Sequence, residues 1–186
     1  KIFFSKFKQT EKFVYYKVIK SLKDNQKVIL YDKMVDEYDI FNKTKSYIKF
    51  TNKEIEYGDE FLKKNFIEGN DKFVCFASRN QNYYNEKINS ARNGDIKVQI
   101  PGVNYLLDNG YKAVRMGRKE YVKIESNNRR IFDYSFSNEI EDFLDVYIVS
   151  KCKFFISTQH GLNEIATSMR VPKLIVNYWF WDDLIA

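Results

Sequence analysis

The sequence predicts an α/β fold built on a doubly wound parallel sheet, and three observations lead to this prediction. From residue 73 onward, short apolar runs alternate with segments whose apolar residues recur at helical spacing. The run 73–77 is apolar throughout, as expected of a strand buried on both faces of a parallel sheet. The chain has 186 residues, of which 44% are hydrophobic, so it can hold one sizeable domain or a domain with part of a neighbour.

The first seventy residues show a less regular pattern. A helix is expected over 13–22, a strand over 28–31 and a second helix over about 52–66. Thr51 and Glu54 have the spacing of a capping box, which marks the start of that second helix. We therefore expect two parts, a partial N-terminal α/β segment over 1–50 and a Rossmann-like domain over 51–186.

The second part alternates between strands and helices in a regular order. Pro101 is expected to open a helix that Asn109-Gly110 closes. A further helix is expected over 138–151, where apolar residues recur three and four positions apart, and another follows residue 157. The expected strands are 73–77, 111–116, 131–134, 153–157 and 172–178.

Composition excludes several classes of protein. No run of eighteen apolar residues is present, so no transmembrane helix is expected. Cys75 and Cys152 lie in apolar stretches without metal-binding or redox spacing, and both are expected to be buried free thiols of a reducing, cytoplasmic compartment. The net charge of +6 comes from scattered Lys, which favours peripheral contact with an anionic membrane at its inner face over nucleic-acid binding.

Arginine is distributed more selectively than lysine. All seven Arg come after residue 73, whereas Lys is spread along the whole chain. Arg presents a planar fork of donors that matches phosphate or carboxylate, which a Lys ammonium cannot do. Arg79, Arg92 and Arg115 are therefore candidate ligand-binding residues, and simple surface placement is the alternative for each.

Ligands of open α/β sheets bind outside the carboxyl ends of the strands. Polar residues stand at or just after the carboxyl ends of four of the expected strands, in the segments 78–95, 115–118, 133–135 and 157–161. Ser157, Thr158 and Gly161 stand where a strand leads into a helix, which predicts an anion site. The alternative is that the two hydroxyl groups only cap the helix. Neither GxGxxG nor a P-loop sequence is present.

Two titratable residues near this turn are candidates for specific roles. His160 is the only histidine, and it could donate to a phosphate, act as a base or have a structural role alone. Glu164 is placed to accept a ribose hydroxyl, and stabilisation by the helix dipole is the alternative.

Short motifs in a fixed order carry a resemblance to a known family. They are 73–76 with Ser78-Arg79-Asn80, Arg92-Asn93-Gly94-Asp95, Val114-Arg115-Met116-Gly117, 131–134, 143–147, 152–156 and Gly161. Together they resemble a family of bacterial glycosyltransferases of surface-polysaccharide and O-antigen synthesis, over roughly residues 50–178. The Arg79 motif is loosely similar to the arginine motif of fucosyltransferase-type enzymes.

The resemblance implies a GT-B fold and a metal-independent transfer from a nucleotide-diphospho-sugar to a surface glycan or lipid-linked acceptor. The nucleotide-sugar is then the co-substrate, with no further cofactor and no metal. Arg79, Arg115, Ser157, Thr158 and Gly161 are expected at the donor diphosphate. The other expected roles are nucleotide binding by Asp133 and Glu164, a catalytic base in Asp95 or else His160, and a loop near the donor containing Arg92, Asn93 and Gly117.

The alternative hypothesis is a catalytically degenerate, Rossmann-like module that binds a nucleotide or glycan and acts with a partner chain. Ala77-Ser78 stand where the family usually has a histidine, and Gln159-His160 replace a small hydroxylated turn. A GT-B enzyme has two facing Rossmann-like domains, and 186 residues hold little more than one. This length is expected of a fragment or of an unusually short member.

Overall fold

The computed structural model describes residues 43–79, 93–118, 122–124 and 130–177, which all belong to one compact unit. The expected helix 13–22 and strand 28–31 lie outside these residues. The helices are α3 (Asn52–Lys64), α4 (Ile100–Asp108), α5 (Asp142–Lys151) and α6 (Leu162–Ser168), with short 3-10 turns η2 (Ile96–Gln99) and η3 (Tyr134–Phe136). The strands are β1 (Phe73–Ala77), β2 (Lys112–Arg115), β3 (Ile131–Asp133), β4 (Phe155–Ser157) and β5 (Lys173–Ile175).

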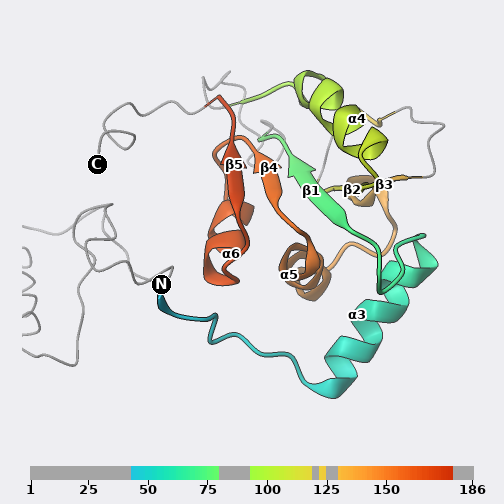
Figure 1. Cartoon of the computed structure of the whole chain (residues 1–186), viewed down its shortest axis with the longest axis vertical. Coiled ribbons are helices and arrows are strands. Elements are labelled where there is room, and N and C mark those ends of the chain that lie inside the picture. Colours follow the sequence, from blue (N-terminus) through green and yellow to red (C-terminus); the bar gives the residue numbers. More distant parts are fainter. Residues whose placement is uncertain (1–42, 80–92, 119–121, 125–129, 178–186) are drawn as a thin grey trace, which may run out of the picture. The chain divides into compact units, whose positions relative to one another are not determined.

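The five strands form one parallel sheet in the order β3-β2-β1-β4-β5. β1 is the central strand, and all five of its residues are buried, as the unbroken apolar run predicts. Figure 1 shows α4 apart from α5 and α6 around this sheet. The doubly wound α/β fold is thus confirmed.

Each face of the sheet has its own apolar core, because successive side chains of a strand point to opposite faces. On one face Val74 and Phe76 of β1 pack with Val103 and Leu107 of α4. On the other face Cys75 belongs to a core that contains residues of α3, α5 and α6. Three layers result, with helices on both faces of the sheet.

The capping box is confirmed at the start of α3. The Glu54 amide donates to Thr51 Oγ1 at 3.4 Å, and the Thr51 amide donates to Glu54 Oε2 at 2.6 Å.

Cys75 and Cys152 are free and buried, as predicted.

The helix predicted over 138–151 begins later than expected, at Asp142. Ser137 Oγ accepts the Glu139 amide at 3.1 Å, and this local bond holds 138–139 in a turn. Glu141 is extended and serves as the N-cap. Ile140 still packs against the core, so its apolar character reflects burial and not helix.

Candidate functional site

The chain reverses its direction across the sheet at one point. From β1 it passes through α4 to β2 on one side, and from β3 it passes through α5 to β4 on the other side of β1. The connections leaving β1 and β4 therefore diverge at the carboxyl ends of these neighbouring strands, which is where open α/β sheets have their ligand crevice. The residues that follow the two strands are Ser78 and Arg79, and Thr158 to Gly161.

Thr158 fixes the backbone of Arg79 at this switch point. The Arg79 amide donates to Thr158 Oγ1 at 2.7 Å, and the Thr158 amide donates to the Ala77 carbonyl at 3.3 Å. Thr158 is 1% exposed, so these bonds are shielded from water. Its hydroxyl does not cap α6, whose N-cap is Gly161 and has no side-chain cap bond.

Ser157 also has a partner other than the helix amides. Its hydroxyl donates to Asn163 Oδ1, and Asn163 Nδ2 in turn donates to the Thr158 carbonyl at 3.0 Å. Both residues are buried. Ser157 therefore stabilises the turn between β4 and α6, and a direct contact with diphosphate remains a prediction.

Gly94 brings the 93–95 segment against the crevice. Its amide donates to the Arg79 carbonyl at 3.1 Å. A Cβ atom at Gly94 would lie 2.6 Å from Thr158 Cγ2 and 3.5 Å from Ser78 Oγ. Only glycine fits this approach without displacing Thr158.

Gln99 lies at the switch point although none of the sequence motifs predicts it there. Its Nε2 donates to the Ala77 carbonyl at 2.8 Å and to Ser78 Oγ at 2.9 Å, and its side chain is buried. Because Ser78 Oγ accepts this bond, the Ser78 hydroxyl keeps its own proton for another acceptor. The sequence feature that could have predicted its role is a polar residue between Ile96, Ile100 and Val103, which all pack into the core.

His160 lies largely buried beside the same turn. Its Nδ1 accepts the Leu162 amide at 3.3 Å, so the proton of the neutral ring is on Nε2. Burial, and then the positive charge of Arg79, lower the pKa of His160 to about 4. The ring is therefore neutral at pH 7 and suits a hydrogen-bond donor. The expectation of a base at His160 does not fit this arrangement.

The backbone amides of 158–162 are partly engaged. Those of Thr158 and Leu162 already have acceptors within the protein. Any anion contact from this turn would therefore come from 159–161, which include Gly161. Glu164 is exposed in the first turn of α6, and its ribose contact remains a prediction.

The predicted loop residues occupy different positions. Asp95 is exposed, and its Oδ1 caps η2 by accepting the Lys97 amide at 2.9 Å, which leaves Oδ2 for a base. Arg92 lies outside the described residues. Gly117 follows β2 with φ of 139°, a conformation that favours glycine.

Arg115 and Asp133 bind each other, away from the crevice. They are register partners on β2 and β3, and Arg115 Nη1 lies 3.1 Å from Asp133 Oδ2. Arg115 is 1% exposed, so in this arrangement the guanidinium is not open to a diphosphate. Its contact with a diphosphate remains a prediction, and in this structure the side chain forms a buried ion pair.

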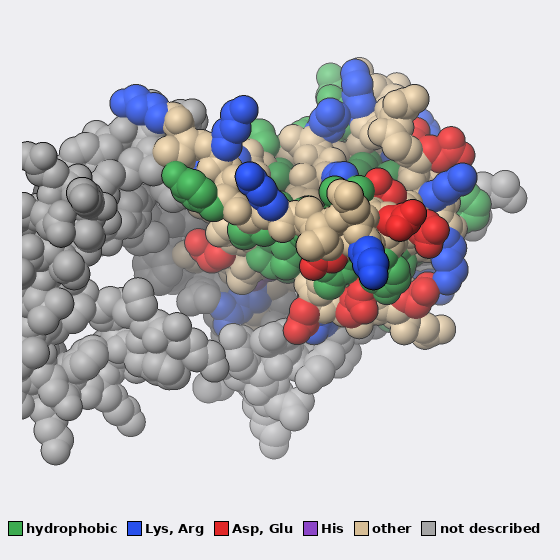
Figure 2. All heavy atoms as spheres, turned by 90° about the horizontal axis from the view of Figure 1, so that it is seen from below, with side chains coloured by type: hydrophobic (Ala, Val, Ile, Leu, Met, Phe, Trp, Pro, Cys, Tyr) green, Lys and Arg blue, Asp and Glu red, His purple; other side chains and the backbone are tan. Residues whose placement is uncertain are grey.

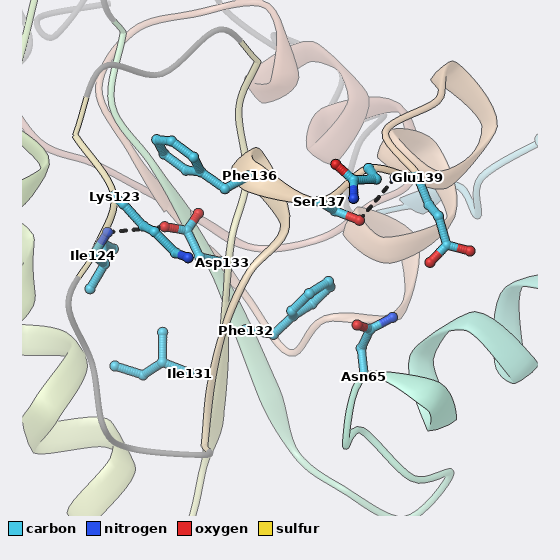
Figure 3. Close-up of a pocket in the computed structure, with 10 residues that line it drawn as sticks. Asn65, Lys123, Ile124, Ile131, Phe132, Asp133, Phe136, Ser137 and Glu139 are labelled. Carbon is cyan, nitrogen blue, oxygen red and sulfur yellow. Dashed lines mark hydrogen bonds between the residues drawn. The ribbon is translucent and has the colours of Figure 1, made fainter.

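Asp133 likewise has its carboxylate engaged. Oδ2 also accepts the Ile124 amide at 3.1 Å, and Oδ1 accepts from Ser135 at 2.5 Å. Figure 3 shows its side chain turned toward Ile124 in a pocket of about 450 Å³ along β3. β2 separates this pocket's strand from β1, so Asp133 does not join the residues at the switch point.

Several buried polar atoms near the switch point have no hydrogen-bond partner. They are Asn93 Oδ1, Gln99 Oε1, Gln159 Oε1 and His160 Nε2. Their residues belong to the two segments that follow β1 and β4. Each such atom costs about 1–3 kcal/mol, so each of them calls for an explanation.

The surface and composition of the described residues add three observations. On the face in Figure 2, Lys and Arg side chains are scattered among Asp and Glu side chains. None of the described helices has the length and apolar character needed to cross a bilayer. In the described ranges, His, Cys, Asp and Glu do not form groups of three or more that could hold a metal ion.

Comparison with known proteins gives one similar structure. No family model matches the sequence, and no curated protein matches it. The structure of E. coli ADP-heptose LPS heptosyltransferase II is similar with a TM-score of 0.49 and 14% identity, over 68% of this chain. The chain spans 38% of the length of that protein.

Proposed function

We propose that the switch point binds a nucleotide-diphospho-sugar and that the chain is part of a metal-independent, GT-B-type glycosyltransferase. The convergence of Arg79, Ser78 and His160 at the carboxyl ends of β1 and β4 carries the proposal. The ordered motifs that resemble bacterial surface-polysaccharide glycosyltransferases support the transfer of a sugar. The acceptor would be a surface glycan or a lipid-linked glycan near the inner face of the membrane.

The chemistry requires that charge on the leaving diphosphate be stabilised as it develops. Arg79 would supply positive charge, and its backbone is held from both sides by Thr158 and Gly94. The Ser78 hydroxyl and the neutral His160 ring would add hydrogen-bond donors. In an inverting reaction, Asp95 would be the base through Oδ2.

Thermal unfolding with nucleotide sugars tests the proposal. UDP-, GDP-, dTDP- and ADP-linked sugars are screened against the wild-type chain, Arg79→Ala and Arg79→Lys. A rise in Tm with one nucleotide is expected, lost in Arg79→Ala and reduced in Arg79→Lys because Lys lacks the planar fork. Arg130→Ala, which changes an exposed Arg on the β2–β3 connection, is the matched control and should keep the shift.

The outcomes separate the candidate functions. No shift with any nucleotide sugar, in a chain that unfolds cooperatively, would contradict the proposal. A shift without hydrolysis or transfer of the sugar would favour the non-catalytic binding module. Equal loss of the shift in Arg79→Ala and Arg130→Ala would place the binding site elsewhere.

A further inference from the structure

Three of the four unpartnered atoms near the switch point are amide oxygens. They belong to Asn93, Gln99 and Gln159. An amide oxygen accepts hydrogen bonds and carries a partial negative charge, so it does not bind a phosphate oxygen. These atoms require a ligand group that donates O–H or N–H.

The orientation of Gln99 is fixed by its neighbours. Nε2 donates to the Ala77 carbonyl, which can only accept, so the opposite atom of the amide is Oε1. Gln99 is 7% exposed, and its oxygen has no partner although its nitrogen has two. A buried polar side chain that is half satisfied is costly unless something completes it.

The donors at the switch point belong to other residues. The Ser78 hydroxyl and His160 Nε2 offer hydrogen-bond donors, and Arg79 adds a positive charge beside them, both of which suit phosphoryl oxygens. The polar groups therefore divide into a donor set for an anion and an acceptor set for hydroxyls. A diphosphate bonded to a sugar carries both kinds of complementary group.

We propose that Asn93, Gln99 and Gln159 determine sugar specificity by accepting hydrogen bonds from hydroxyl groups of the transferred sugar. This inference rests on the proposed function, because it concerns the same ligand. It adds that the acceptor set binds the sugar and the donor set binds the diphosphate. Removal of the acceptor set should therefore weaken binding of the sugar but not of the nucleotide diphosphate.

Asn93 allows the cleanest test, since the Gln99 amide also holds Ala77 and Ser78. Asn93→Leu keeps the shape and removes the acceptor, and Asn93→Asp keeps an oxygen there. Asn104→Leu, an exposed change on α4, is the matched control. Affinities are measured by calorimetry for UDP and UDP-glucose, GDP and GDP-mannose, and ADP and ADP-glucose, alongside Tm without ligand.

We expect Asn93→Leu to bind the nucleotide diphosphate like wild type and the nucleotide sugar about tenfold more weakly. Its Tm without ligand should be unchanged or higher, because an unsatisfied buried oxygen has been removed. Asn93→Asp should keep the preference for the nucleotide sugar. A merely structural Asn93 would instead lower the Tm on change to Leu.

Two results would overturn the inference. One is an unchanged ratio of the two affinities in Asn93→Leu, which contradicts the acceptor set while leaving nucleotide binding intact. The other is a lower Tm for Asn93→Leu than for Asn104→Leu. If wild type binds none of these probes and its Tm does not rise with any nucleotide sugar of the thermal screen, the proposed function itself is contradicted, and the acceptor set with it.

Discussion

Acidification is expected to destabilise the protein through its single histidine. The folded state holds the pKa of His160 at about 4, whereas an unfolded chain has a histidine pKa of about 6.5. Between these pH values His160 binds a proton in the unfolded chain but not in the folded state. The free energy of unfolding therefore decreases as the pH drops. Above pH 6.5 the ring is neutral in both states, and the contribution is fully present.

The magnitude follows from the difference between the two pKa values. The gap corresponds to about 3 kcal/mol over the full window, of which about 2 kcal/mol is lost by pH 5. Burial is the main cause of the low pKa, and the positive charge of Arg79 adds to it. A side chain that cannot be protonated should not show this loss.

Urea unfolding of wild type and His160→Gln at pH 7, 6 and 5 measures the effect. The difference in unfolding free energy between the two proteins should shift by about 2 kcal/mol against wild type from pH 7 to pH 5. NMR gives a second measurement, because one histidine yields one titration curve. A ring that titrates near pH 6.5, with parallel pH profiles for the two proteins, would refute the reasoning.

Two glycines give further predictions. Gly94→Ala places a Cβ 2.6 Å from Thr158 Cγ2, so we expect a loss of about 1–3 kcal/mol in urea unfolding and weaker nucleotide-sugar binding. Gly102→Ala, in open space on α4, is its control and should gain about 0.5–1 kcal/mol; equal effects would contradict the packing argument. Gly58→Ala places a methyl group against the buried Tyr147 ring. Thermal unfolding should therefore show a lower Tm, although Ala has a better helix propensity than Gly. An unchanged Tm would argue against tight packing between α3 and α5.

The sheet was predictable because its strands are buried on both faces. Such strands leave continuous apolar runs, and 73–77 matches β1 residue for residue. The start of α5 was not predictable from the sequence. Ile140 lies before the helix but packs against the core, so its position matches the spacing of the apolar residues within the helix. The spacing of apolar residues indicates which residues are buried. The local backbone conformation can instead be determined by a side-chain hydrogen bond such as the one that Ser137 Oγ accepts.

The candidate site was predictable where it depends on strand ends. Arg79 and Thr158 were found that way, and they are hydrogen-bonded in the structure. Arg115 also stands at a strand end, as the last residue of β2, but its register opposite Asp133 places it in an ion pair. That register is set by the pairing of β2 with β3, which no local sequence pattern encodes. Gln99 and Gly94 depend in the same way on contacts between distant segments.

The central position of β1 has a consequence for folding. Its partner β4 is distant in sequence, and the bond between Arg79 and Thr158 joins residues 79 positions apart. Closing so long a loop costs chain entropy before the contacts between the strands can form. We therefore expect β1 and β4 to pair after the β1–α4–β2 unit has formed. The crevice would then be assembled last on the folding route, and its amides should exchange with solvent sooner than those between β1 and β2.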